Sequence, residues 1–274
     1  MKKSILITGC SSGIGLCVAN GLKTRGYQVF ATARKQSDVD TLRGQGLDAL
    51  KLDLNDSDSI HATVNEILTQ TDGTLYALFN NGAYGQGGAV EDLSRNALRE
   101  QFETNVFGWM ELTNHVIPVM RRQGYGRIIQ NSSILGFIAL KYRGAYIASK
   151  FAIEGLSNTL RLELRGTNIY VSLIQPGPIT SKFRENAFPK FIEHIDVNNS
   201  AHSAHYAKVI ERYKAAGPVQ PFTLPPEAVL KRVIHALESR RPKNHYPVTF
   251  PTYLFAYLQR ILPSRILDRI LNKI

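Results

Sequence analysis

The sequence predicts an α/β fold: a doubly wound, mainly parallel seven-stranded sheet with helices on both faces. Short apolar runs rich in β-branched residues alternate with longer amphipathic segments from the N-terminus onward. Strands that alternate with helices in this way form parallel sheets through right-handed crossovers. A glycine-rich turn directly after the first strand is typical of Rossmann-type domains. We find no internal repeat and no linker, so 1–274 is expected to form one domain.

Composition and charge limit the classes of function. With 43% hydrophobic and 20% charged residues, the chain suits a soluble globular protein. Its net charge of +11 would attract anions, but the Lys and Arg residues are scattered, so we expect no nucleic-acid partner. The cysteines, Cys10 and Cys17, give neither a disulfide framework nor a zinc pattern, and we expect no metal site. No stretch reads as a signal peptide or a spanning helix, so the cytoplasm is the expected compartment.

The first strand is expected over Ser4–Thr8, and a glycine turn joins it to a helix that runs to about Arg25. The turn reads Thr-Gly-x-x-x-Gly-x-Gly, which differs from the generic dinucleotide fingerprint. Glycines let the backbone approach a phosphate closely, and the helix N-terminus offers it free N–H groups. A plain tight turn is the alternative, but the position between strand and helix favours phosphate binding.

The second strand, Gln28–Ala33, bears on the choice of cofactor. In dinucleotide folds, an acid at the end of this strand binds the 2′-hydroxyl of NAD. Here Ala33 is followed by Arg34 and Lys35, which suit a 2′-phosphate. The pattern therefore favours NADP(H) over NAD(H), the alternative being that both cations are merely exposed loop charges.

The next part of the chain continues the alternation. A third strand, 49–54, ends near an acid, Asp53, that could meet the adenine, and a helix is expected over 57–71. A fourth strand over 75–79 ends at Asn80 and Asn81, and a glycine-rich loop follows. A long helical region, 95–122, contains Asn105 beside a glycine, where an Asn can disturb the helical hydrogen bonds.

A strand over Gly126–Asn131 and the helix after it carry a recognisable chemical device. The strand delivers Ser132 and Ser133 at its carboxyl end, and Tyr146 and Lys150 lie one turn apart on one face of the helix. A positive charge near a phenol favours the phenolate and lowers its pKa. With a serine hydroxyl opposite, the set could exchange a proton with a carbonyl–alcohol pair. The alternative is a helix that carries Tyr and Lys four apart by chance.

The last third contains two further strands, 170–174 and 245–249, and a helix over 227–240. The sixth strand ends in a stiff Pro-Gly-Pro turn at the carboxyl edge of the sheet, where ligands bind. The segment 181–220 has the weakest secondary-structure signal, and we expect it to cover the substrate. His202 and His205 within it are expected to be solvated rather than metal ligands. The amphipathic tail 253–274, broken at Pro263, is expected to dock on the fold or on a partner subunit, with an interfacial membrane helix as the alternative.

Taken together, these motifs resemble the short-chain dehydrogenase/reductase family over nearly the whole chain. The resemblance rests on six motifs in order: Thr8-Gly9…Gly13-Ile14-Gly15, Asn80-Asn81, Asn105, Ser133, Tyr146-x-x-x-Lys150 and Pro176-Gly177. The spacings also agree, since Ser133 precedes Tyr146 by 13 residues and follows Asn105 by 28. One departure is Asn81-Gly82-Ala83, where the family usually has Asn-Ala-Gly.

The resemblance implies roles for individual residues. Tyr146 would be the general acid in reduction and the base in oxidation, with Lys150 lowering its pKa and holding the nicotinamide ribose. Ser133 would orient the substrate oxygen, and Asn105 would hold a water that links Lys150 to solvent. Ser132 is expected to be structural. The implied cofactor site consists of Gly9, Ser11, Ser12, Gly13, Ile14 and Gly15 around the pyrophosphate, Arg34, Asp53 and Leu54 on the adenosine side, and Asn81, Tyr146, Lys150, Pro176, Gly177 and Ile179 around the nicotinamide half.

These features predict an NADP(H)-dependent oxidoreductase that transfers hydride to or from a carbonyl or alcohol carbon. The ending of the second strand and the tail resemble bacterial aldehyde and ketone reductases near the 17β-hydroxysteroid and retinol dehydrogenase branch. An apolar aldehyde, ketone, retinoid or steroid-like substrate is therefore expected, as is a homodimer or homotetramer, with peripheral membrane contact through the tail as an alternative location. The competing functional hypothesis is a non-catalytic dinucleotide-sensing protein on the same fold.

Overall fold

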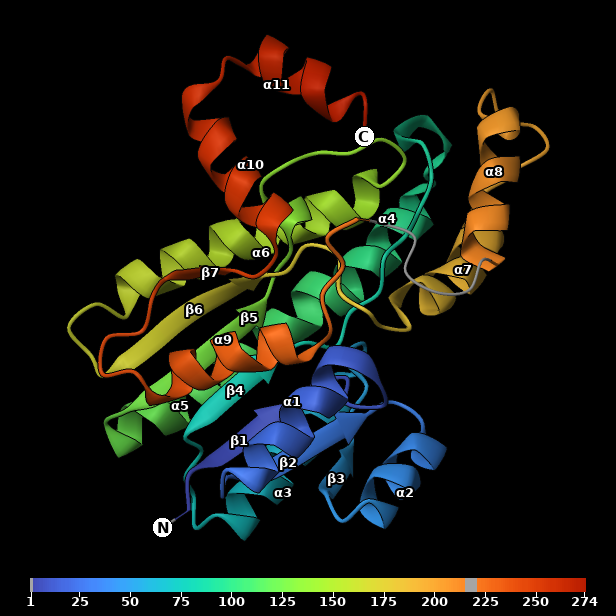
Figure 1. Cartoon of the computed structure of the whole chain (residues 1–274). Coiled ribbons are helices and arrows are strands. Elements are labelled where there is room, and N and C mark those ends of the chain that lie inside the picture. Colours follow the sequence, from blue (N-terminus) through green and yellow to red (C-terminus); the bar gives the residue numbers. More distant parts are fainter. Residues whose placement is uncertain (1, 215–220) are drawn as a thin grey trace.

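The computed structural model describes residues 2–214 and 221–274, and its centre is a seven-stranded sheet (Figure 1). The strand order is β3-β2-β1-β4-β5-β6-β7, and each of the neighbouring pairs is parallel. The predicted doubly wound α/β fold is thus confirmed. The strands are β1 (Ser4–Ile7), β2 (Gln28–Ala33), β3 (Asp48–Lys51), β4 (Ala77–Asn80), β5 (Gly126–Asn131), β6 (Ile169–Gln175) and β7 (His245–Pro247).

Helices cover both faces of this sheet because successive side chains of each strand point to opposite sides. On β1, Ile5 and Ile7 belong to one buried cluster and Leu6 to the other. The first cluster packs under α1 (Gly13–Thr24), α2 (Gln36–Gly44) and α9 (Glu227–Glu238). The second packs under α3 (Ser57–Gln70), α5 (Gly108–Gln123) and α6 (Gly144–Glu163).

The long helical region predicted over 95–122 is interrupted in its middle. It consists of α4 (Arg95–Phe102), a π-helical turn η2 (Glu103–Phe107) and α5. Asn105 lies within the π turn and is fully buried. Single π turns inside helices occur frequently at functional sites, because the extra residue per turn redirects a side chain.

The segment 181–220 has more secondary structure than predicted. It forms α7 (Phe183–His194) and α8 (Ser203–Lys214), while 215–220 lies outside the described residues. Phe191 and Tyr206 are buried together against Ala89, beside the short helix η1 (Val90–Asp92). These helices are stabilised by tertiary packing, which local sequence signals do not report.

His202 and His205, predicted to be solvated, are half-buried. His205 stacks on Tyr142 with ring centroids 3.8 Å apart, and His202 meets the same ring edge-on at 5.3 Å. Nε2 of His202 also lies 2.6 Å from a carboxylate oxygen of Glu91. Both side chains therefore pack α8 and its start against Tyr142 in the segment before α6, and His202 also connects to η1.

The C-terminal tail forms two helices, α10 (Phe250–Ile261) and α11 (Ser264–Leu271), separated at Pro263. Figure 1 shows them at one end of the molecule, beside α6 and away from α2 and α3. Their inner side packs against the short helix η3 (Ile134–Gly136) and its neighbours in one apolar cluster. Tyr146 belongs to that same cluster, so the tail lies next to the predicted catalytic tyrosine.

Candidate active site

The turn between β1 and α1 leaves room for a group that binds close to the backbone. Gly9 and Gly13 adopt φ angles of 70° and 58°, which side chains with a Cβ rarely adopt. A Cβ on Gly15 would overlap the carbonyl oxygen of Gly9. The N-cap residue of α1, Ser12, makes no side-chain capping bond, so the N–H groups of the first helical turn remain available to an anion.

The end of β4 holds this turn in place. Nδ2 of Asn81 donates hydrogen bonds to the carbonyl oxygens of Thr8 and Gly9, at 2.9 and 3.1 Å. Oγ1 of Thr8 accepts from the N–H groups of Asn81 and Gly82, both at 2.8 Å. A Cβ on Gly9 would lie 2.5 Å from Cα of Gly82, so the two strand ends are in close contact. The unusual Asn-Gly-Ala order therefore keeps a small residue at this contact.

The residues predicted to bind the adenosine half lie at the same edge of the sheet. Ala33 ends β2 and is buried, whereas Arg34 is exposed beside it. Asp53 follows β3 and accepts a hydrogen bond from the N–H of Asn55, and Leu54 is buried. Ser11 is exposed on the adjacent turn.

The predicted catalytic side chains come together over the ends of β5 and α6. The hydroxyls of Ser133 and Tyr146 are hydrogen-bonded to each other. Lys150 is 2% exposed, and its Nζ donates to the carbonyl oxygen of Asn131 at 2.8 Å. The same Nζ lies 4.3 Å from the centroid of the Trp109 ring and 5.6 Å from that of the Tyr146 ring. A serine, a tyrosine and a lysine thus form one compact group.

The electrostatics of this group differ from the prediction. Burial raises the pKa of Tyr146 to about 12, opposed by its hydrogen bond to Ser133 and by the charge of Arg143. Burial also lowers the pKa of Lys150 to about 7, opposed by Glu154. Arg143, and not Lys150, is the charge that lowers the Tyr146 pKa here, and desolvation outweighs it, so the lowering by Lys150 stays a prediction. Tyr146 consequently keeps its proton at neutral pH.

Asn105 connects this group to the loop after β4. Its Oδ1 accepts from the N–H of Tyr84 at 3.2 Å, and its Nδ2 donates to the carbonyl oxygen of Tyr84 at 2.9 Å. Nδ2 also lies 3.1 Å from Oγ of Ser149, whose hydroxyl donates to the carbonyl oxygen of Tyr146 at 2.7 Å. The π turn thereby positions Asn105 to fix the helical turn that carries Tyr146.

The turn after β6 closes the nicotinamide side of the predicted site. The carbonyl oxygen of Pro176 accepts from the N–H of Ile134 at 2.7 Å, next to Ser133. A Cβ on Gly177 would overlap Oγ1 of Thr249, so this turn fits closely against the start of α10. Ile179 packs on the same core cluster as Ile14 of the α1 turn.

Two functional neighbours were not predicted from the sequence. Phe183 meets the Tyr146 ring edge-on, with ring centroids 5.3 Å apart. Glu154 is 8% exposed and accepts a hydrogen bond from Nε2 of Gln175 at 2.9 Å. Its spacing of four residues from Lys150 was a usable signal. Nothing local indicated Phe183, since only the fold brings α7 to α6. Trp109, interpreted as core filler, also contacts the lysine.

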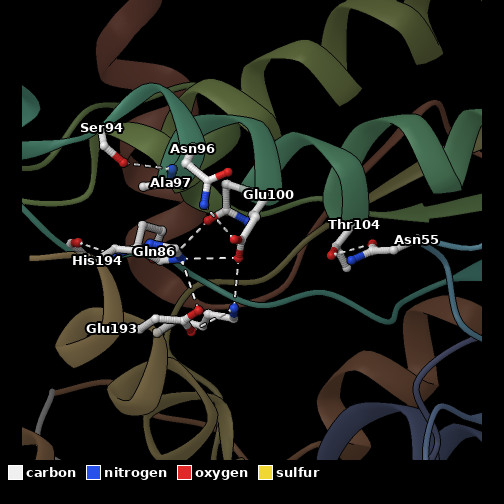
Figure 2. Close-up of polar contacts among 12 residues, drawn as sticks. Asn55, Gln86, Ser94, Asn96, Ala97, Glu100, Thr104, Glu193 and His194 are labelled. Atoms are coloured by element: carbon white, nitrogen blue, oxygen red, sulfur yellow. Dashed lines mark hydrogen bonds and ion pairs between the residues drawn. The ribbon is translucent and has the colours of Figure 1, made fainter.

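A polar network attaches α7 to α4 beside this site. Nζ of Lys190 lies 2.8 Å from a carboxylate oxygen of Glu100 and 2.8 Å from one of Glu193. Nε2 of His194 lies 3.1 Å from the same Glu100 oxygen. Figure 2 shows Glu193 and His194 approaching Glu100, with Gln86 nearby. Although Glu100, Glu193 and His194 bring three metal-ligand atoms together, both carboxylates are already ion-paired with the Lys190 ammonium.

Comparisons with known proteins agree with this geometry. The short chain dehydrogenase family matches residues 3–191. The uncharacterized oxidoreductase YbbO of Escherichia coli is 42% identical over 272 residues, covering 99% of this chain and 95% of that protein. The chain belongs to the short-chain dehydrogenase family. It is an oxidoreductase of that family, whose members act on CH–OH groups.

Two further similarities extend the comparison. Retinol dehydrogenase 8 of Homo sapiens is 31% identical over 250 residues, which cover 88% of this chain and 79% of that protein. A short chain dehydrogenase/reductase from Burkholderia phymatum, solved in complex with NAD, matches with a TM-score of 0.79 at 23% identity. That match covers 99% of this chain and 95% of the other, and it supports the shared fold.

Proposed function

We propose that the protein is an NADP(H)-dependent oxidoreductase that interconverts an apolar carbonyl compound and its alcohol. The observation that carries this proposal is the hydrogen-bonded pair of Ser133 and Tyr146 with buried Lys150 beside it, at the glycine-lined edge of a parallel sheet. Loss of one of these catalytic side chains would favour the alternative of a non-catalytic dinucleotide-sensing protein. All three side chains are present and adjacent, so catalysis is the better explanation.

The residues at the sheet edge fit a dinucleotide. The tight β1–α1 turn would hold the pyrophosphate, Asn81 and Lys150 the nicotinamide ribose, and Ile179 the carboxamide. A Cβ on Gly15 would overlap the carbonyl oxygen of Gly9, so the turn has no space for a side chain there. This tight backbone supports the assignment of the turn to the pyrophosphate. When bound, the nicotinamide supplies or accepts the hydride.

Tyr146 and Ser133 would handle the substrate oxygen. In reduction, the Tyr146 hydroxyl gives its proton to the oxygen on which negative charge develops, while Ser133 donates a second hydrogen bond to it. With a pKa of about 12, Tyr146 is protonated at neutral pH and still more acidic than the alcohol it forms. This protonation state favours the reductive direction. Asn105 acts by positioning, and its proton-relay role stays a prediction.

The preference for NADP(H) rests on Arg34. It is exposed directly after β2, where no carboxylate follows Ala33 to bind a 2′-hydroxyl. An Arg34→Asp variant should therefore shift the kcat/KM ratio from NADPH toward NADH by at least tenfold. Lys51→Asp, an exposed cation at the end of β3, is a control that should leave the ratio unchanged. An unaltered ratio in the Arg34 variant would remove this residue from the 2′-phosphate site.

The substrate class follows from the apolar surroundings of Tyr146. The ring shares a cluster with Leu135, Ile138 and Phe255, and Phe183 packs against it. The similarity to retinol dehydrogenase 8 points in the same direction. A screen of aldehydes, ketones, retinoids and steroids, followed by NADPH absorbance, would identify the class.

A substitution at Tyr146 tests the reaction itself. Tyr146→Phe removes only the hydroxyl, so carbonyl reduction should fall by at least a hundredfold while NADPH still binds. Tyr170→Phe, on β6, serves as the control and should keep full activity. Retained reduction in the Tyr146 variant would refute the assignment, and dinucleotide binding without turnover in the unmodified protein would favour the sensing alternative.

The assembly is proposed to be a homodimer or homotetramer. Phe151, Leu156 and Leu162 of α6 are large apolar side chains left exposed in the single chain. Burying them between copies would explain their exposure. Light scattering of the purified protein gives the mass directly, and a monomer at micromolar concentration would contradict the proposal.

A further inference from the structure

The C-terminal helices carry an apolar surface that the fold does not use. The inner side of α10 packs through Phe255 and Leu258 into the cluster around Tyr146. On the other side, four large side chains are exposed, and we call them the outer stripe: Tyr253, Leu254, Tyr257 and Ile261. Of these, Tyr253 also accepts a hydrogen bond from Arg232 of α9 through its hydroxyl. Tyr257 is 65% exposed and Ile261 56%. Contiguous exposed apolar side chains of this kind mark interaction sites.

Cations flank the outer stripe. Arg260 precedes Ile261 on α10, Arg265 and Arg269 lie four apart on one face of α11, and Lys273 follows the end of that helix. All four are exposed. Against these four cations, the stretch 250–274 contains one acid, Asp268. The complementary partner is therefore anionic as well as apolar.

We propose that α10 and α11 dock the protein on the surface of an anionic lipid bilayer. The outer stripe would enter the headgroup layer, where tyrosine is favoured because it combines an apolar ring with a polar hydroxyl. The cations would contact lipid phosphates. No helix within 2–214 and 221–274 is long and apolar enough to cross a membrane, so the contact is peripheral. The location of both helices at one end of the molecule leaves them free to meet a flat surface (Figure 1).

A second copy of the chain fits this surface less well. A symmetric contact through α10 and α11 would bring two sets of four cations together against two acids. Like charges across an interface oppose association, whereas phosphate headgroups attract the same side chains. The charge therefore selects the bilayer over self-association. Since the inner side of these helices contacts Tyr146, docking would also bring the catalytic group close to the lipid, although binding does not depend on the reaction proposed above.

Co-sedimentation of the full chain with vesicles tests this inference. Vesicles of equal parts phosphatidylglycerol and phosphatidylcholine should bind the protein, and vesicles of phosphatidylcholine alone should bind it much less. Each cation near an anionic surface contributes about a fivefold increase in affinity. The triple variant Arg260→Gln, Arg265→Gln, Arg269→Gln should therefore lose roughly a hundredfold. The variant Leu254→Ser, Tyr257→Ser, Ile261→Ser should lose more than tenfold, because it removes the apolar part.

Matched controls lie on α5 and α7, away from α10 and α11 (Figure 1). Arg121→Gln with Arg122→Gln on α5, and Ile192→Ser on α7, change exposed residues of the same types and should leave vesicle binding unchanged. Circular dichroism and a thermal melt confirm that each variant is folded. Absence of binding to the phosphatidylglycerol vesicles, or equal losses in the controls, would overturn the proposal. The proposal would also be overturned if the Leu254→Ser, Tyr257→Ser, Ile261→Ser variant kept its vesicle binding but had a lower mass in light scattering. The outer stripe would then join two copies of the chain.

Discussion

Lys150 should destabilise the folded protein at neutral pH, and replacing it with Met tests this. The ammonium is 2% exposed and its pKa is lowered from 10.5 to about 7 by burial. A lysine whose pKa is depressed on folding binds fewer protons in the folded than in the unfolded chain between these two values. Its destabilising effect is therefore complete below about pH 7 and disappears as the pH rises toward 10.5.

The magnitude follows from the size of the pKa change. At about 1.4 kcal/mol per pKa unit, charging the buried amine costs on the order of 4 kcal/mol at neutral pH. Methionine has a similar length and no charge, but it leaves the carbonyl oxygen of Asn131 without its donor, which costs about 1 to 3 kcal/mol. The variant should thus be more stable than the unmodified protein by about 2 kcal/mol at neutral pH, while losing activity.

Urea denaturation without cofactor, at about pH 6.5 and about pH 9, measures the effect. The advantage of Lys150→Met should shrink by about 2 to 3 kcal/mol over this interval, because only the unmodified protein is relieved of the charge. Lys231→Met, at an exposed position on α9, is the control and should show no such change. If the difference between Lys150→Met and the unmodified protein is the same at both pH values, Lys150 is not desolvated as the structure indicates.

Three further predictions concern other contacts. Glu154 raises the pKa of Lys150, so Glu154→Gln should lower that pKa and move the alkaline limb of the kcat/KM profile to lower pH. Glu163→Gln, at an exposed site on the same helix, is the control, and identical pH profiles for the two variants would contradict the prediction. Gly15→Ala introduces an overlap with the Gly9 carbonyl and should reduce NADPH affinity at least tenfold in a fluorescence titration. Gly155→Ala in α6 meets open space, so it should keep NADPH affinity and raise the free energy of unfolding by about 0.5 to 1 kcal/mol. Equal losses of NADPH affinity in the two variants would show that the contact with the Gly9 backbone is not the cause. Glu100→Gln weakens the contacts of α4 with Lys190 and His194, so KM should rise several-fold with kcat nearly unchanged, and an unaltered KM would mean that α7 does not depend on this network.

The buried environment of the catalytic group has a consequence for direction. Tyr146 with a raised pKa holds its proton and is ready to donate it, which suits reduction. Oxidation requires the phenolate, which must first form against the desolvation penalty. We therefore expect kcat for oxidation to increase more steeply with pH than kcat for reduction.

Part of this protein could be predicted from local sequence. The alternating apolar runs determined the parallel sheet, because each strand buried on both faces must be apolar throughout. The glycine turn and the spacing of Tyr146 and Lys150 were also readable, since backbone strain and helical periodicity are local properties. Together with the resemblance to a known family, these signals predicted that Ser133, Tyr146 and Lys150 lie close together, but not that Phe183, Glu154 and Trp109 surround them.

Tertiary structure decided what those side chains experience. The pKa values of Tyr146 and Lys150 depend on desolvation by the surrounding protein, which the spacing of four residues does not contain. The helices α7 and α8, and the position of Phe183 over Tyr146, likewise arise from packing between distant segments. Periodicity in a sequence reports neighbours along one helix or strand, whereas burial and charge depend on contacts that only the folded chain creates.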